Sequence, residues 1–403
     1  MATQLFSEKQ LSNYADVLIW ALKTARAKPF QKKDVILVRY DMPARRFAEI
    51  IFKKLLEMGM NPIQRLNTSP DMEFNFYDIS DNDQLVFQAP GDKELYNSLN
   101  GLISLRAPES ITHLSSIDPQ KIGKASIARK YVRDILNARE DAGHFGWTLC
   151  SYPTPVPAEH ADLSPEIYAE QIAKACFINS DNPVAKWEEI FSEATRIKTW
   201  LNSLDVDYYH VKSANTDLKV YPGEKRKWIG ISGHNIPSFE LFISPDYRKT
   251  SGTYFADQPS FQSGNYVKNI RVQFEDGVAV TVNADEGESF TQKQFTMDKG
   301  AGRLGEFSLT DKRFSKINKF MADTLFDENF GGKNGNCHVA LGSSYSDTYD
   351  GDPTELTPAL KEELGFNDSA LHWDIINTEE KTVTAWLKSG ETLVIYEDGM
   401  FTI

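Results

Sequence analysis

The hydrophobic pattern changes character along this 403-residue chain, and that change constrains the fold more than any other feature. In the first half, segments with apolar residues at helical spacing, such as 11–27, alternate with short β-rich runs, such as 34–40. Such alternation is typical of a layered α/β domain with a largely parallel sheet. From Leu218 onward, short strand-like runs are separated by turn dipeptides such as Asp276-Gly277. This second pattern predicts an antiparallel or mixed sheet with a few helices.

The length of the chain favours two domains, because a single small core does not grow to this size. A proline-rich segment, residues 153–157, interrupts the alternating pattern and is interpreted as a linker or turn. We therefore expect an α/β (α+β) protein with a layered α/β domain over residues 1–155 and a mixed-sheet domain over residues 156–403.

Charge and cysteine content limit the classes of partner. A net charge of -13 argues against a general binder of nucleic acid or anionic membrane, which needs a basic face. The three cysteines, an odd number, match no zinc knuckle or CxxC redox pair and favour a reducing compartment. No apolar signal core opens the sequence, and no apolar run approaches the roughly 20 residues that span a bilayer. We expect a cytoplasmic protein without nucleic-acid or membrane partners.

Carboxylates and histidines gather in the last 170 or so residues, in or beside short apolar or Gly-rich segments. A charged side chain in such a segment is costly unless it is paired or bound to metal. The residues are Glu240, Glu306, Glu328, His338, His372 and Asp374.

His372 and Asp374 are two residues apart in a β-rich run, so on a strand both would point to the same face and Trp373 to the other. Together they can offer one nitrogen and one oxygen to a shared volume. The alternative is a partly exposed strand on which Asp374 pairs with a basic side chain.

The other members of this set also have simpler interpretations. Glu240 is compatible with an edge strand, and His338, at the start of an apolar run, is compatible with a satisfied core residue. Glu306 follows residues 300–305, which formally match GxGxxG. A dinucleotide fingerprint requires a preceding parallel strand and a following helix, whereas here a strand follows. Tyr345 is compatible with packing at a loop or with donating a hydrogen bond to a developing oxyanion.

The combined charge of the set is more informative than its members. Glu240, Glu306, Glu328 and Asp374 carry four negative charges, which two divalent cations would neutralise. If the four converged without metal, repulsion would force at least one to hold a proton. Mixed imidazole and carboxylate ligands suit zinc, cobalt or manganese better than copper or calcium. The motifs of serine hydrolases (GxSxG), zincins (HExxH) and phosphate loops are absent from the sequence.

Several stretches of the chain together resemble the thermophilic metalloaminopeptidase family, the group of aminopeptidases T and S. The resemblance covers essentially the whole chain, but its specific motifs follow residue 150. The motifs are NIPSFELFISPD (235–246), GRLGEF (302–307), LFDEN (325–329), CHVALG (337–342) and SALHWDI (369–375).

This resemblance implies an α/β N-terminal domain, a C-terminal catalytic domain, a homodimer and a site for two cations, zinc or cobalt, with manganese or magnesium as further candidates. It implies that all six clustered residues are metal ligands, that Glu306 bridges the two ions and that Tyr345 is the catalytic tyrosine. Two departures from the family pattern are Phe239, where members usually have glycine, and a Gly-rich insertion between Glu328 and His338.

The expected function is hydrolysis of the N-terminal residue from peptides by water activated between two metals, with Glu306 and Tyr345 in the catalytic set. Two alternatives stay open. One is a non-catalytic relative that binds metal or peptide, and the other is a dinuclear metal hydrolase of a different amide, such as an acylated amino acid.

Overall fold

A computed structural model describes residues 5–403, and the chain forms two compact units. The first unit contains the residues up to Ile117, Lys124–Phe191 and Ile231–Ser238. The second contains Asp118–Gly123, Ser192–Gly230 and Phe239–Ile403. The domain boundary that we placed at residues 155 and 156 stays a prediction.

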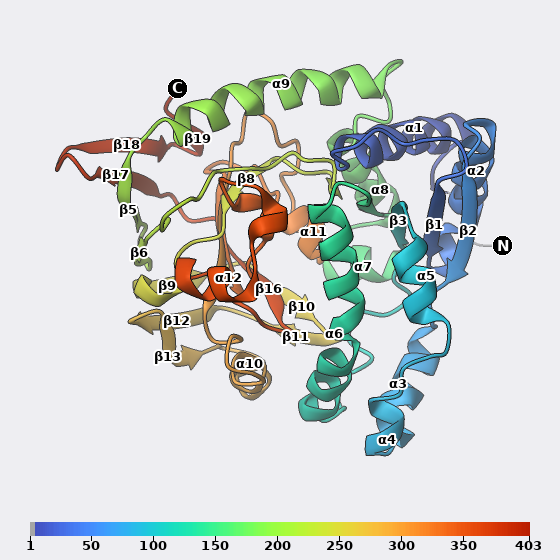
Figure 1. The fold of residues 1–403 in the computed structure, drawn as a ribbon, viewed down its shortest axis with the longest axis horizontal. Coiled ribbons are helices and arrows are strands. Elements are labelled where there is room, and N and C mark those ends of the chain that lie inside the picture. Colours follow the sequence, from blue (N-terminus) through green and yellow to red (C-terminus); the bar gives the residue numbers. More distant parts are fainter. Residues whose placement is uncertain (1–4) are drawn as a thin grey trace. The chain divides into compact units, whose positions relative to one another are not determined.

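A five-stranded parallel sheet with the order β2-β1-β3-β4-β7 forms the centre of the first unit, as the alternating pattern predicted (Figure 1). The strands are β1 (Val35–Tyr40), β2 (Asn61–Leu66), β3 (Gly101–Arg106), β4 (Gly146–Ser151) and β7 (Asn235–Ile236). The helices of this part of the chain are α1 (Glu8–Thr24), α2 (Arg45–Glu57), α3 (Pro70–Ile79), α4 (Asn82–Leu85), α5 (Asp92–Ser98), α6 (Pro119–Asp141), α7 (Pro155–His160) and α8 (Pro165–Ala175).

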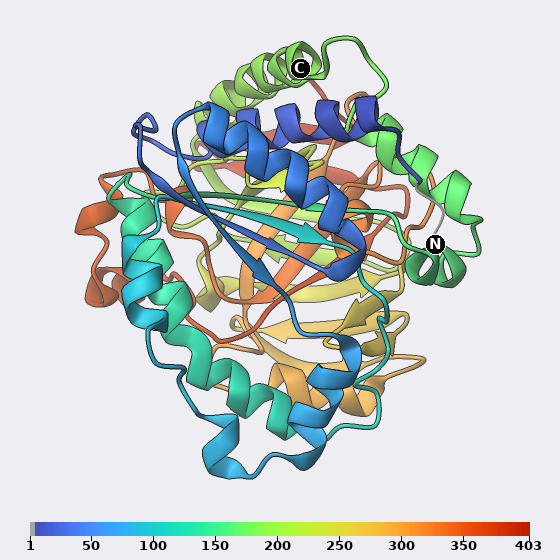
Figure 2. The same cartoon turned by 90° about the vertical axis from the view of Figure 1, so that its right-hand side faces the viewer.

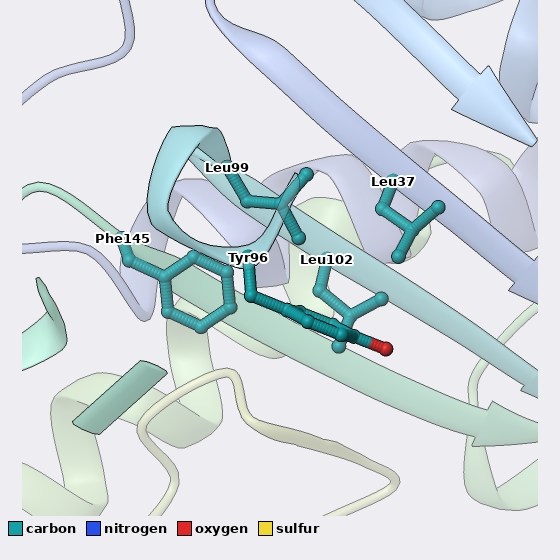
Figure 3. Packing of buried hydrophobic residues seen from close by; sticks show 5 residues of the cluster. All are labelled: Leu37, Tyr96, Leu99, Leu102 and Phe145. Carbon is teal, nitrogen blue, oxygen red and sulfur yellow. The ribbon is translucent and has the colours of Figure 1, made fainter. Parts of the chain in front are cut away.

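Helices cover both faces of this sheet. Helices α1 and α2 pack along one face (Figure 2). On the other face, Leu37 and Leu102 of the strands contact Tyr96 of α5, together with Leu99 and Phe145 (Figure 3). Apolar residues of α6 pack against the same cluster. Two covered faces explain why the central strands β1 and β3 read as largely apolar runs.

Helices α3 and α7 each begin at a proline. Pro70 opens α3 after the N-cap Ser69, whose hydroxyl accepts the N–H of Met72. Pro155 is the first residue of α7, so the proline-rich segment expected to be a linker or turn instead starts a helix. Proline favours this first position because its missing N–H would have no partner there and its φ is already helical.

The second unit is built mainly from antiparallel sheets, as the later part of the sequence predicted. An eight-stranded sheet has the order β13-β12-β9-β6-β5-β17-β18-β19, and a four-stranded sheet has the order β16-β15-β14-β8. The strands of the larger sheet are β5 (Val206–Lys212), β6 (Asp217–Val220), β9 (Ser251–Ala256), β12 (Ile270–Glu275), β13 (Val278–Asn283), β17 (Thr382–Leu387), β18 (Thr392–Glu397) and β19 (Met400–Phe401).

The four-stranded sheet consists of β8 (Glu240–Ile243), β14 (Leu304–Thr310), β15 (Asn336–Gly342) and β16 (His372–Asn377). A separate hairpin joins β10 (Ser260–Gln262) and β11 (Asn265–Val267). The helices are α9 (Pro183–Asn202), which leads into this unit, α10 (Glu288–Phe295), α11 (Thr324–Asp327) and α12 (Pro358–Leu364).

One face of the four-stranded sheet packs against the rest of the unit. The Phe307 ring lies 6.0 Å from the Tyr209 ring of β5, measured between centroids. The Tyr254 hydroxyl of β9 donates to the carbonyls of Cys337 and Ile375. Trp373 packs against Phe295, on the side that the alternation of a strand predicted. We call this side of the four-stranded sheet the core face and the opposite side the site face.

Within residues 5–403, no helix combines the length and the apolar character that crossing a membrane requires. All three cysteines are buried and free of disulfide bonds.

Candidate metal centre

The site face of the four-stranded sheet collects the carboxylates and histidines predicted from the sequence. Residues paired across strands share a face, and the register pairs Glu306 of β14 with Ala340 of β15, and Ala340 with Asp374 of β16. Two residues away along β15, His338 is paired with Ser308. The small side chains of Ala340 and Ser308 leave room between the larger polar groups.

The donor atoms form two overlapping groups. His338 Nε2 lies 3.1 Å from Glu240 Oε2 and 3.3 Å from Glu306 Oε1. His372 Nε2 lies 3.5 Å from Glu306 Oε2 and 3.6 Å from Asp374 Oδ1. Within each group of three residues, the candidate ligand atoms lie within 4.8 Å of one another. Glu306 belongs to both groups and directs one carboxylate oxygen toward each histidine.

Glu328 reaches the same cluster from outside the sheet. It follows α11 as the C-cap residue and is buried. Its carboxylate interacts electrostatically with Glu240 and Asp374, and both charges raise its pKa after the larger effect of burial. Five of the six residues that the sequence singled out therefore form the two ligand groups, and Glu328 lies near enough to interact with them electrostatically.

Because these residues are buried together, ionising all of them has a high free-energy cost. Glu240, Glu306, Glu328 and His338 are each no more than 6% exposed, and His372 and Asp374 are partly buried. Burial raises the pKa values of Glu240, Glu328 and Asp374, and neighbouring carboxylates raise them further. Without cations, these groups must take up protons to coexist, as like charges in a small volume do.

For Glu306 and the two histidines, the neighbouring groups favour the charged form. Although burial opposes it, hydrogen bonds from His338 and His372 lower the pKa of Glu306 to about 2. Burial would lower the pKa of His372, but Asp374 and Glu306 raise it to about 9. The pKa of His338 is raised well above its ordinary value, against the effect of burial, by Glu240 and Glu306. Protons on the two histidines thus occupy the places that divalent cations would take.

The imidazole of His372 is oriented by a backbone group. Its Nδ1 lies 2.9 Å from the Ser343 carbonyl oxygen, so Nδ1 donates and Nε2 faces Glu306. Metal-binding histidines are commonly fixed in this way through their second nitrogen. The sequence carried no signal for the role of Ser343, because any residue supplies a carbonyl.

Tyr345 lies at the rim of the cluster. Its ring centroid is 4.8 Å from that of His372 and 5.7 Å from that of Phe242, and its backbone N–H donates to Ser244 Oγ over 2.9 Å. Desolvation of the hydroxyl, followed by the nearby carboxylates Glu306 and Asp374, raises the pKa of this phenol well above its ordinary value. The phenol is therefore a hydrogen-bond donor at neutral pH, not a base.

The glycines before Glu306 permit close backbone approach. A Cβ added at Gly305 would lie 2.4 Å from the carbonyl oxygens of Gly342 and Ser343. Residues 300–303 form a turn in which the Arg303 N–H donates a hydrogen bond to the Gly300 carbonyl, and β14 follows this turn. The GxGxxG match therefore reflects packing of a strand beside β15.

Comparison with known proteins identifies relatives over nearly the full chain. The model of the thermophilic metalloprotease family (M29) matches residues 7–401. Aminopeptidase T of Thermus aquaticus is 29% identical, over 72% of this chain and 74% of the relative. Aminopeptidase 2 of Geobacillus stearothermophilus and aminopeptidase AmpS of Bacillus subtilis are each 26% identical, over 97% and 92% of this chain and 97% and 94% of the relatives.

The fold has a solved counterpart. The structure of wild-type AmpT from Thermus thermophilus covers 97% of this chain and 99% of its own, with a TM-score of 0.78 and 22% sequence identity. The resemblance predicted from the sequence motifs is confirmed, since the family match spans both units and every strand of the candidate site. The chain belongs to the thermophilic metalloprotease family, M29.

Proposed function

We propose that this metalloprotease is an aminopeptidase that removes the N-terminal residue of peptides by means of two divalent cations. The main support for two cations is that Glu306 belongs to two ligand groups and offers a different carboxylate oxygen to each. A carboxylate shared in this way is what a pair of adjacent cations requires. The names of the relatives, aminopeptidases T, 2 and AmpS, support the exopeptidase activity.

The donor set fits two divalent cations. Glu240 and His338 would hold one ion, His372 and Asp374 the other, with Glu306 shared and Glu328 as the sixth ligand. Two dications balance the four carboxylates and remove the repulsion that raises the pKa values of Glu240, Glu328 and Asp374. The mixture of two imidazoles with four carboxylates favours zinc or cobalt, with manganese or magnesium as further candidates.

The cations would supply Lewis-acid polarisation of the scissile carbonyl and acidification of the attacking water. The protein residues provide the rest. The Tyr345 hydroxyl, a phenol whose ordinary pKa of about 10 keeps it protonated at neutral pH, donates a hydrogen bond to the oxyanion that develops on the carbonyl. The Ser343 carbonyl accepts from His372 Nδ1 and orients the ring so that Nε2 would face the cation. The free amine of the substrate would bind a cation or a carboxylate of the cluster and so set the position of cleavage.

The proposal is tested by release of amino acid from aminoacyl p-nitroanilides, assayed after chelation and after addition of zinc or cobalt. We expect activity with a free amine, loss on chelation and recovery with metal. N-acetylated versions of the same substrates should be inert. Folded protein that is inactive in every metal condition would contradict the peptidase, and preference for the blocked substrates would favour a hydrolase of acylated amino acids.

We further propose a homodimer in a reducing, cytoplasmic setting. Strand β2 is an edge of its sheet, and its apolar residues Ile63 and Leu66 are exposed. An unpaired strand edge is suited to association with a second copy. The three cysteines are buried and form no disulfide bond, which supports a reducing compartment. Light scattering during gel filtration should give twice the chain mass of 45.6 kDa, and a monomer would contradict the dimer.

A further inference from the structure

Glu328 is the member of the proposed ligand set that lies outside the strands. The other five are carried by β8, β14, β15 and β16, whose ladders fix their positions. Glu328 instead ends the single turn of α11 and precedes the Gly-rich segment that leads to β15. A short turn beside such a segment cannot by itself hold a ligand within the tolerance that a metal site needs.

Asn329, the next residue, is fully buried, and its side-chain amide joins three parts of the site. Its Oδ1 accepts the backbone N–H of Phe239, the residue before Glu240, over 2.5 Å. Its Nδ2 donates to the Leu325 carbonyl of α11 over 3.0 Å and lies 3.4 Å from Glu328 Oε1. One amide therefore links the start of β8, helix α11 and the carboxylate of Glu328.

The backbone of the turn that bears Glu328 is also fixed to the four-stranded sheet. The Glu328 carbonyl accepts hydrogen bonds from Asn336 Nδ2 at 2.8 Å and from Thr310 Oγ1 at 3.2 Å. Thr310 and Asn336 are cross-strand partners in β14 and β15, and Thr310 is also paired with Glu240. These bonds fix the turn as a whole, and the Asn329 amide contacts both the Glu328 side chain and the Phe239 backbone.

We propose that Asn329 is a positioning residue that sets Glu328 relative to Glu240 for binding of the cations. The role rests on the proposed function, because it presumes that the cluster binds metal. Groups that orient metal ligands by hydrogen bonds influence affinity strongly, and their loss typically costs about 10–100-fold. Phe239 is thereby tied through its N–H to the turn that bears Glu328.

The test compares cation binding by wild type, Asn329→Leu and Asn329→Ala. Leucine keeps the approximate volume of asparagine and removes both hydrogen-bonding atoms, and alanine serves if leucine prevents folding. The matched control is Asn377→Leu. Asn377 is equally buried, lies on the core face of β16 opposite Cys337, and donates to the Phe255 carbonyl over 2.8 Å. Zinc is titrated against a chromogenic chelator, and thermal midpoints are measured in chelator.

We expect the Asn329 variants to bind at least one of the two zinc ions about 10–100-fold more weakly than wild type. Asn377→Leu should lower the thermal midpoint in chelator yet keep wild-type zinc affinity, which separates positioning from general destabilisation. Folded Asn329 variants with wild-type affinity for both ions would overturn the positioning role, as would an equal loss in Asn377→Leu. Wild-type protein that binds no cation would overturn the proposed function itself.

Discussion

Glu306 is the residue that makes the cluster one site, because each of its carboxylate oxygens faces a different histidine. It is also the carboxylate whose pKa is lowered, to about 2, while burial raises those of Glu240, Glu328 and Asp374. Glu306 thus stays ionised over the range in which the others compete for protons. A group with this property is suited to be shared by two cations.

The hydroxyl of Tyr345 should act in the chemical step and not in metal binding. Tyr345→Phe is expected to lower kcat by about 10²–10³, the usual effect of removing one oxyanion donor, with little change in KM or zinc content. Steady-state kinetics and metal analysis provide the measurement. Tyr349→Phe, at a buried tyrosine of the same segment, is the control and should retain activity. Full activity of Tyr345→Phe would remove this tyrosine from the catalytic set.

The histidines make cation binding depend on pH. The folded, metal-free pKa of His372 is about 9, against an ordinary value of 6.5. Its contribution to stability is therefore complete below pH 6.5 and lost as pH rises through 9. Cations bind only the deprotonated ring, so zinc affinity should increase from pH 6.5 to 9 with release of protons. Calorimetry in buffers of different ionisation enthalpy measures this release, and pH-independent affinity without it would contradict the scheme.

At the scale of elements, the four-stranded sheet separates packing from chemistry by the alternation of its strands. Ala340 faces the site between Glu306 and Asp374, whereas the neighbouring Val339 faces the core between Phe307 and Ile375. The two residues are adjacent in sequence and equally buried. They therefore offer a direct test of the two faces.

Ala340→Val should weaken zinc binding about tenfold or more, because overpacking costs typically 1–3 kcal/mol and about 1.4 kcal/mol is tenfold in an equilibrium constant. Val339→Ile should lower the free energy of unfolding of the metal-free protein by a similar amount and leave zinc affinity unchanged. Chelator competition and denaturant unfolding measure the two quantities. If Ala340→Val and Val339→Ile bound zinc with equal affinity, the assignment of Ala340 to the site face and Val339 to the core face would be wrong.

Much of this element-level description could be predicted from sequence because strand alternation is local. The spacing of His372 and Asp374 already placed both on one face and Trp373 on the other, and the structure confirms this. The contribution of Asn329 could not be predicted, since a buried amide is indistinguishable in sequence from a loop asparagine. The helix that starts at Pro155 was missed because proline marks helix starts as well as turns.

At the scale of the whole molecule, the proposed ligands all belong to one of the two units. Bound cations stabilise the folded state by mass action, by about 2.7 kcal/mol per site at a free concentration 100 times Kd. The added protection of backbone amides from hydrogen exchange should be concentrated in the strands that carry the proposed ligands. The parallel sheet of the first unit holds none of the six.

Hydrogen–deuterium exchange with and without zinc tests this localisation. Peptides from β14 and β15 should exchange more slowly with zinc, because they supply Glu306 and His338, while peptides from β1 and β3 should change little. Equal protection in β1 and β3 would show that the cations act on the chain as a whole. Chelator should return the exchange of β14 and β15 to the metal-free rate.

The central claim, a pair of cations that share Glu306, is tested most directly by an anomalous-difference map of crystals grown with zinc or cobalt. We predict two peaks about 3.5–4 Å apart, the spacing of two-metal sites. One peak should contact Glu240 and His338, the other His372 and Asp374, and both should contact Glu306. A single peak, or ions bound away from Glu306, would contradict the account.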